Sequence, residues 1–120
     1  MENNNKILVD TIVKGIQEKK GKGITIINLQ GIEGAIANYF VICEGNTPVQ
    51  VEAIAGEISD TVRKDLHEKP AHCVGLEEAT WVAIDFVDVM VHVFVPDARD
   101  YYDLDHLWQD AKVEYIADLD

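Results

Sequence analysis

The chain contains few of the residues that mark disulfide-rich, membrane-spanning or low-complexity proteins. Its 120 residues include two cysteines, three prolines and one serine, and no segment approaches the roughly eighteen consecutive apolar residues that a membrane span requires. Because the cysteines lie 30 positions apart without a CxxC motif, neither a disulfide framework nor a zinc site is encoded. With 48% hydrophobic residues, we expect one globular domain over residues 1–120, located in the cytoplasm.

Motifs for catalysis are also scarce. None of the four histidines occurs in an HxxxH or HExxH pattern, so we expect no metal site and no cofactor. The only serine, Ser59, falls inside a helical pattern and away from any glycine elbow, which argues against a serine nucleophile.

Positive charge is the next shortage, because 10 basic residues stand against 22 acidic ones and the formal net charge is −12. Residues 77–120 hold 2 basic and 12 acidic residues, whereas residues 1–76 hold 8 and 10. This charge would repel a phosphate backbone, so we expect no direct nucleic-acid partner. It would attract a basic protein, although an acidic surface can also serve only to keep a small protein dissolved.

Three segments at the start of the chain have clear periodic patterns. Apolar residues recur every four positions from Leu8 to Ile16 and predict a helix over residues 5–20. Residues 24–29 and 37–45 are rich in β-branched and aromatic side chains and predict two strands, paired antiparallel.

A helix start is encoded at Thr47-Pro48-Val49-Gln50. Threonine is a favoured N-cap, proline suits the first helical position, and glutamine at the third position can complete a capping box. The apolar face continues to Leu66, and Pro70 predicts the end of the helix near Lys69. Residues 71–76 then predict a short strand.

Residues 81–95 have the pattern of a β-hairpin with its turn near Val87 and Asp88. Valine is unfavourable where a tight turn requires a positive φ, so a two-residue loop and a four-residue loop are equally compatible with the pattern. Either loop predicts the same opposed pairs: Trp81 with Phe94, Ala83 with His92, and Asp85 with Met90.

Alternation of side chains divides this hairpin into two unlike faces. One face is entirely apolar and is predicted to be core: Val82, Ile84, Phe86, Val89, Val91, Val93 and Val95. The other mixes aromatic rings with a carboxylate and an imidazole, a combination that a sealed core tolerates poorly. This second face is therefore the candidate functional face: Trp81, Ala83, Asp85, Met90, His92 and Phe94.

The segment after the hairpin brings a basic residue next to more aromatic ones. Arg99 is one of two basic residues after position 76, and it precedes Tyr101 and Tyr102. Asp103 then predicts the N-cap of a last helix whose apolar stripe packs on the sheet: Leu104, Leu107, Trp108 and Ala111. Residues 112–120 fit either a short strand or an acidic tail.

One local pattern is compatible with an enzyme. The turn Gly45-Asn46-Thr47 joins a strand to a helix, where backbone amides can bind an anion, as in nucleotidyltransferases. Such enzymes also need two carboxylates one residue apart on a strand to hold Mg²⁺. Asp85 and Asp88 are three apart, and Asp103 and Asp105 fall at a predicted helix start. Neither pair meets this requirement, so a nucleotide-binding or nucleotidyltransferase-like enzyme is the alternative hypothesis and not the first one.

Several short motifs resemble, in order and spacing, those of the Iojap family, the ribosomal silencing factors of bacteria and organelles. They extend from about Asn5 to about Lys112: Asn38-Tyr39-Phe40-Val41-Ile42, Trp81-Val82 with Asp85 and Asp88, Val91-His92-Val93-Phe94, Arg99 with Tyr101 and Tyr102, and Leu104-Asp105-His106-Leu107-Trp108 followed by Asp110-Ala111. The sequence departs from the family pattern where it has Asn38 for aspartate, Thr47 for serine, Val74 for glutamate and Val87 for glycine.

This resemblance implies an α/β (α+β) fold, a mixed sheet of about five strands flanked by helices, which would be a degenerate relative of the nucleotidyltransferase fold. It also implies a non-catalytic function. The expected partner is the large ribosomal subunit, bound through its basic ribosomal protein L-fourteen where the small subunit joins. Binding there would block subunit joining and repress translation.

We expect eight residues to form or support this contact: Trp81, Asp85, His92, Phe94, Arg99, Tyr101, Tyr102 and Leu104. Aromatic and arginine side chains are the types that anchor protein interfaces. A homodimer that buries the Trp81 face against itself is a further possibility.

Overall fold

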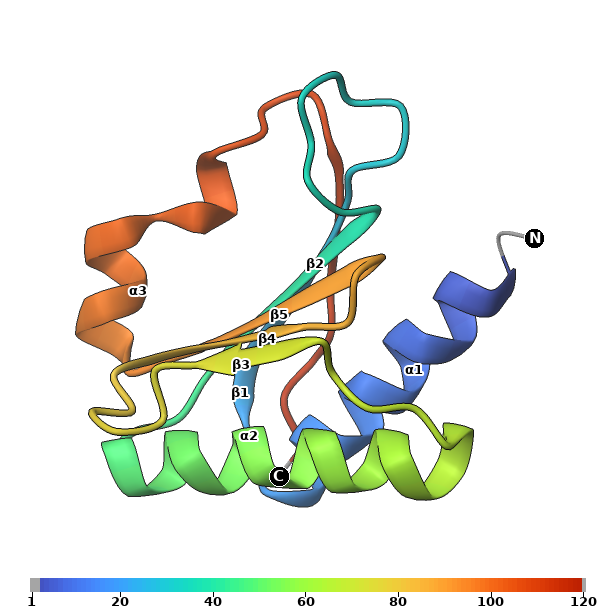
Figure 1. Ribbon diagram of the computed structural model, residues 1–120. Helices are drawn as coiled ribbons and strands as arrows, with labels where there is room; N and C mark the ends of the chain where they lie inside the picture. The colour runs from blue at the N-terminus through green and yellow to red at the C-terminus, as the bar shows by residue number, and fades with distance from the viewer. Residues whose placement is uncertain (1–2, 120) are drawn as a thin grey trace.

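The computed structural model describes residues 3–119, which fold into six strands and four helical segments (Figure 1). In chain order these are α1 (Asn3–Glu18), β1 (Lys22–Asn28), β2 (Tyr39–Glu44), α2 (Pro48–Leu66), β3 (His72–Val74), β4 (Trp81–Asp85), β5 (Val89–Phe94), α3 (Pro96–Tyr102), the 3₁₀ turn η1 (Leu104–His106) and β6 (Lys112–Tyr115). The predicted domain, residues 1–120, also includes Met1, Glu2 and Asp120. These three residues lie outside the described residues.

The six strands form one mixed sheet in the order β3-β4-β5-β2-β1-β6. Its central β2–β5 pair is parallel, and the other four pairs are antiparallel. The prediction of a mixed sheet flanked by helices is confirmed, including the antiparallel pairing of the first two strands. The expected number of about five strands is wrong by one, because the C-terminal residues add β6 beside β1.

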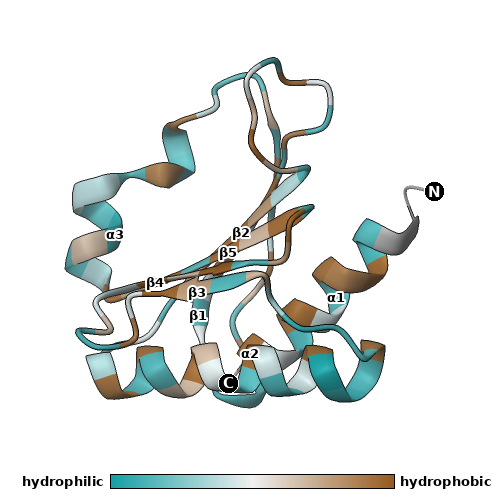
Figure 2. Cartoon of the chain, viewed as in Figure 1, coloured by the Kyte–Doolittle hydropathy of each residue, from teal (hydrophilic) through white to brown (hydrophobic). Residues whose placement is uncertain are grey.

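Helices α1 and α2 lie together on one side of the sheet (Figure 1). The apolar side chains of β4 and β5 predicted to be core point to these helices, and Figure 2 shows the hydrophobic central strands above helices of mixed character. Burying one Val or Ile side chain contributes roughly 1.5–3 kcal/mol, so this layer is a main source of stability. Its fully buried members include Ile12, Ile16, Ile54, Ile58, Val82, Ile84, Val91 and Val93.

The ends of α2 test the predicted helix signals. Thr47 is the N-cap, and its Oγ1 accepts a hydrogen bond from the backbone N–H of Gln50 at 3.2 Å, as predicted. The helix ends at Leu66, before the predicted boundary near Lys69. His67 adopts the left-handed conformation, with a φ of 57°, and ends the helix before Pro70 is reached.

The hairpin of β4 and β5 has the predicted register, with the opposed pairs Trp81–Phe94, Ala83–His92 and Asp85–Met90. Of the two compatible loops, the tight one occurs. The backbone N–H of Phe86 donates to the Val89 carbonyl at 2.9 Å across Val87 and Asp88. Val87 has a φ of 74°, a conformation that β-branched residues rarely adopt. The Asp85 carboxylate supports the turn by accepting from the Val87 N–H at 2.7 Å.

Residues 96–111 cross the other face of the sheet, where α3 and η1 lie opposite α1 and α2 (Figure 1). They cover a second apolar cluster. Its buried members are Ile27, Leu29, Phe40, Ile42 and Phe94, and its partly buried members include Trp81, Met90, Ala98, Leu104, Trp108 and Ala111. Both faces of the central strands are therefore buried.

The predicted last helix, with Asp103 as its N-cap, is wrong. The helix lies one segment earlier, in Pro96–Tyr102, with proline and Asp97 in its first turn. Asp103 ends it in the left-handed conformation, with a φ of 53°, and a single 3₁₀ turn follows. Leu104, Trp108 and Ala111 still pack on the sheet as predicted, but Leu107 is exposed.

The C-terminal residues resolve the choice between strand and tail. Lys112–Tyr115 pair antiparallel with β1 as β6, and the chain then continues beside the start of β1. The Asp118 carboxylate accepts from the Gly23 N–H at 2.9 Å, and Lys22 Nζ donates to the Leu119 carbonyl at 3.0 Å. Among all the helices of residues 3–119, none is long and apolar enough to cross a membrane.

The backbone strain at Val87 leads to a stability prediction. Replacing Val87 by glycine should raise the free energy of unfolding by roughly 1 kcal/mol, because relief of about 1–3 kcal/mol of strain exceeds the roughly 0.5–1 kcal/mol cost of glycine's extra freedom. Little packing is lost, since Val87 is 65% exposed. Urea denaturation of both proteins measures the change.

The matched control is Val74→Gly, at an exposed valine of β3 whose φ is not positive. This substitution should destabilise the protein. Equal losses of stability in the two variants would contradict the strain at Val87.

Candidate partner-binding site

Three aromatic residues meet where β4 begins and α3 ends. Tyr101 is 81% exposed, Tyr102 is 49% exposed and Trp81 is half-buried. The ring centroids of Trp81 and Tyr102 are 4.5 Å apart, and those of Tyr101 and Tyr102 are 5.0 Å apart with perpendicular planes. We call Trp81, Tyr101 and Tyr102 the aromatic surface.

The rest of the predicted functional face is not open to solvent. His92 is only 4% exposed and Phe94 is fully buried, because residues 96–111 cover the central strands on this side. Phe94 stacks under Trp81 at 5.2 Å between ring centroids. Phe94 can therefore support the aromatic surface from below but cannot itself touch a partner.

His92 is held as a neutral imidazole. The indole Nε1–H of Trp81 donates to His92 Nδ1 at 3.1 Å, so the proton of the neutral ring resides on Nε2. Burial lowers the pKa of His92 to about 4. Nε2 has no hydrogen-bond partner in the structure, and the imidazole contacts Phe40 edge-on at 4.8 Å. The indole nitrogen of Trp108 is likewise buried and has no hydrogen-bond partner in the structure, whereas that of Trp81 is paired with His92.

Arg99 lies inside the structure rather than on the surface, with its side chain only 13% exposed. It contacts Asp105 with two hydrogen bonds, at 2.7 and 3.1 Å, and Glu44 with one at 3.2 Å. Burial lowers the pKa of Arg99, but Asp105 and Glu44 more than offset this effect and raise it overall. The guanidinium is charged and fully engaged within the chain.

Two other predicted site residues also have internal roles. Asp85 is half-buried and supports the Val87 turn. Leu104 is partly buried in the second apolar cluster. Of the eight predicted residues, only Tyr101 and Tyr102 are classed as exposed, with Trp81 beside them.

Acidic side chains surround the aromatic surface on α3 and the residues that follow. Asp97, Asp100 and Asp103 are all exposed. The exposed His106 lies 2.6 Å from Asp103, whose hydrogen bond raises the pKa of this imidazole. The site thus combines aromatic rings with excess negative charge.

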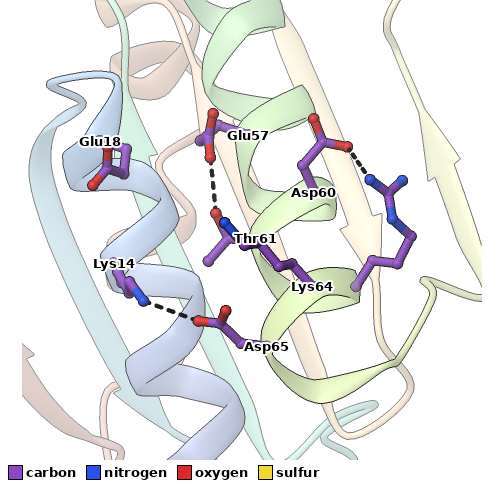
Figure 3. A pocket seen from close by; sticks show the side chains of 8 residues that line it. Lys14, Glu18, Glu57, Asp60, Thr61, Lys64 and Asp65 are labelled. Carbon is purple, nitrogen blue, oxygen red and sulfur yellow. Dashed lines mark hydrogen bonds and ion pairs between the residues drawn. The ribbon is translucent and has the colours of Figure 1, made fainter.

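A groove between α1 and α2, on the outer side of these helices, is lined by charged side chains that pair with one another (Figure 3). Lys14 bonds Asp65 at 3.0 Å, and Glu57 accepts from Thr61 at 2.9 Å. Nothing in it resembles a nucleophile with its base.

Metal and thiol chemistry both depend on which His, Cys, Asp and Glu side chains come together. Within residues 3–119, no cluster of three or more His, Cys, Asp and Glu side chains could hold a metal ion. Cys43 is buried, and burial raises the pKa of its thiol to about 12, whereas Cys73 is exposed on β3. Cys43 is therefore not a reactive nucleophile at neutral pH.

Two of the three backbone amides of the Gly45-Asn46-Thr47 turn are used within the chain. The Gly45 N–H donates to the Phe94 carbonyl at 2.9 Å, and the Asn46 N–H donates to Gln50 Oε1 at 2.7 Å. The Gln50 N–H is used by the Thr47 cap. The pattern that favoured an enzyme is accounted for by helix capping.

Fold and surface together define a small α+β protein whose conspicuous surface feature is aromatic and acidic rather than catalytic. The family model described as "Ribosomal silencing factor during starvation" (RsfS) matches residues 2–120. The chain is 40% identical over 118 residues to "Ribosomal silencing factor RsfS" of Bacillus subtilis, covering 98% of this chain and 95% of that protein. It is 27% identical over 73 residues to chloroplastic Protein Iojap of Zea mays, covering 61% and 31%.

A crystal structure from Bacillus halodurans has a similar fold, with a TM-score of 0.76 at 37% identity over 86% of this chain and 94% of that one. The chain belongs to the RsfS family of ribosomal silencing factors, the Iojap family, whose members are not enzymes. The family resemblance seen in the sequence is confirmed, and it disfavours the alternative of a nucleotidyltransferase-like enzyme.

Sequence reasoning missed the acceptors around Arg99. Gly23 and Thr25 of β1, Glu44 of β2 and Asp105 of η1 all bond its guanidinium. One signal was present, since a lone arginine among many acidic residues favours an internal ion pair. The partners on β1 and β2 are 55 to 76 positions away along the chain, and no local pattern could identify them.

The buried His92 predicts a pH dependence of stability. Its pKa is about 4 in the folded state against 6.5 ordinarily, so the unfolded chain takes up the proton first as the pH falls. Stability contributed by neutral His92 is present above pH 6.5 and is lost progressively towards pH 4. Between pH 7.5 and 5.0 this loss should be about 2 kcal/mol. In His92→Leu the loss over this range should be smaller by that amount, measured by urea denaturation.

Trp81→Phe serves as the control, because it removes the indole N–H but keeps a ring beside His92. Since burial causes the shift, this variant should retain the steep pH dependence. Parallel stability curves for His92→Leu and the unchanged protein would contradict the assignment.

Proposed function

We propose that the protein acts on ribosomes in the cytoplasm, binding the large ribosomal subunit through its ribosomal protein L-fourteen and blocking the small subunit from joining. The aromatic surface, Trp81, Tyr101 and Tyr102, forms the contact. The observation that carries the proposal is the exposure of Tyr101 and Tyr102 beside Trp81 in a chain that belongs to the ribosomal silencing factors.

The amino-acid types of this surface support an interface. Tyrosine and tryptophan are the residues most often found at energetic hot spots, because a rigid ring buries much area for little loss of conformational freedom. Trp81 and Tyr102 already contact each other at 4.5 Å between ring centroids and rest on Phe94. They are therefore largely ordered before a partner arrives, which lowers the entropic cost of binding.

Charge supports a basic partner. Residues 77–120 carry 12 acidic and 2 basic residues, and one of the two, Arg99, is neutralised inside the structure. The exposed carboxylates of Asp97, Asp100 and Asp103 would steer a basic protein surface to the aromatic rings. The same charges would oppose contact between two copies of this surface, so a homodimer formed here would be favoured by high salt. Because it would use the same surface, such a dimer would compete with binding to the ribosome.

Exclusion of the small subunit follows from size. The folded chain measures 35 × 33 × 28 Å, which is too large to fit between two surfaces that must meet. Repression then depends on occupancy, and hence on the concentration of the protein relative to its dissociation constant.

Removing the aromatic rings should weaken binding. Tyr102→Ala and Trp81→Ala are each expected to lower the affinity for purified large subunits by more than about 1 kcal/mol, roughly fivefold in Kd. Co-sedimentation measures the effect, and circular dichroism checks that each variant is folded. Val49→Ala is the control, since this exposed apolar side chain lies on α2 on the opposite side of the sheet. Unchanged binding by both folded aromatic variants would refute the site.

The steric mechanism predicts a change in subunit joining. Adding the protein to a mixture of large and small subunits should shift a sucrose-gradient profile from joined ribosomes to free subunits, and Tyr102→Ala should shift it less. If the protein binds large subunits without any shift to free subunits, exclusion is not its mechanism.

A further inference from the structure

Helix α3 carries Tyr101 and Tyr102, the two tyrosines of the aromatic surface, but has little to hold it in place. None of its seven residues is fully buried. Ala98 is the partly buried member that it contributes to the second apolar cluster, and the Tyr102 ring contacts Trp81 at a tilt of 44°. A helix this short is unstable on its own in water. Its position must come from contacts with the rest of the chain.

Arg99 supplies five such contacts, one for each N–H of the guanidinium. Nε donates to Asp105 Oδ1 at 3.1 Å, and Nη2 donates to Asp105 Oδ2 at 2.7 Å and to Thr25 Oγ1 at 3.0 Å. Nη1 donates to the Gly23 carbonyl at 2.7 Å and to Glu44 Oε1 at 3.2 Å. No donor is left for an outside partner.

The acceptors belong to three separate elements, so the guanidinium fixes α3 against β1, β2 and η1 at once. The two-pronged contact with Asp105 also sets the plane of the guanidinium, because both oxygens must lie in that plane. A fixed plane at Arg99 fixes the rotation of α3 about its own axis.

That rotation decides where the tyrosines point. Successive helical residues turn by about 100°, so Tyr101 lies about 200° from Arg99 and faces away from the sheet. Tyr102 lies only about 60° from Arg99, on the side where it meets Trp81. The observed exposure, 81% for Tyr101 and 49% for Tyr102, agrees with this geometry.

Gly23 is required for the same arrangement. It has a φ of 61°, and a Cβ placed there would lie 2.6 Å from Arg99 Nη1. Only a glycine lets its carbonyl approach the guanidinium this closely.

We infer that Arg99 is the positioning residue of the partner-binding site: its guanidinium holds α3 so that Tyr101 and Tyr102 are presented beside Trp81, and it does not touch the partner. The inference rests on the proposed function for the role of these rings. This positioning role takes the place of the expectation that Arg99 itself contacts the partner. Lysine cannot take its place, because one ammonium group cannot bond acceptors spread over three elements in a plane.

The free protein provides the first test. In a Trp108→Phe background, Trp81 is the only tryptophan, and its close contact with Tyr102 should give a near-ultraviolet circular dichroism band. Arg99→Lys should weaken this band while the far-ultraviolet spectrum and cooperative unfolding persist. Arg63→Lys is the matched control, since Arg63 is the other arginine of the chain and lies exposed on α2. If Arg99→Lys does not fold, Asp105→Asn tests the same contact. An unchanged band in a folded variant overturns the inference.

A double-mutant cycle on binding provides the second test. Arg99→Lys should lower the affinity for large subunits by about fivefold or more, but by less than about twofold in a Tyr101→Ala/Tyr102→Ala background, where the positioned rings are absent. Equal factors in both backgrounds would mean that Arg99 acts on its own and would overturn the inference.

The two tests separate the inference from the function on which it rests. If the unchanged protein fails to bind large subunits, the proposed function fails. The near-ultraviolet band of the free protein still decides whether Arg99 positions the rings.

Discussion

The structure depends on a constraint at its centre: strands β2 and β5 carry apolar side chains on both faces, so the sheet must be covered twice. Val41 and Cys43 of β2 face one cluster, and Phe40 and Ile42 face the other. Helices α1 and α2 cover the first side with long amphipathic faces. The second side is covered by residues 96–111, which form a short helix, a 3₁₀ turn and irregular chain, together with Ile32, Ala35 and Ala37 of the loop between β1 and β2.

This second cover links stability to binding. Because it is short, it is anchored by polar contacts, and the chain places one arginine where five acceptors from β1, β2 and η1 converge. The same cover buries His92 as a neutral ring and leaves Trp81 at its margin, beside Tyr101 and Tyr102. The aromatic surface is thus the outer edge of a core layer, ordered by what lies beneath it. Under the proposed function, such order would reduce the conformational freedom lost on binding.

Much of the architecture could be predicted from local patterns. The hairpin register follows from alternation, and the start of α2 follows from Thr47, Pro48 and Gln50. The last helix lies one segment before its predicted position, because Asp103 fits an N-cap as well as the left-handed C-cap that it forms, and Pro96 fits the end of a strand as well as the start of a helix. The candidate site was found in part. Tyr101 and Tyr102 are exposed, but His92, Phe94 and Arg99 are internal, since alternation shows which residues share a face and not whether that face is covered.

By itself, the sequence determined the family, the apolar face of the hairpin, the absence of a paired-carboxylate motif and the acidic character of the C-terminal third, because each of these is a matter of residue type and short spacing. Only the tertiary structure decided that the mixed face lies under a second cover, that Trp81 contacts Tyr102 at its margin, and that Arg99 serves the fold. These depend on contacts between segments as far apart as Gly23 and Arg99. No local pattern records them, because the hydrogen bonds exist only once the sheet has brought the segments together.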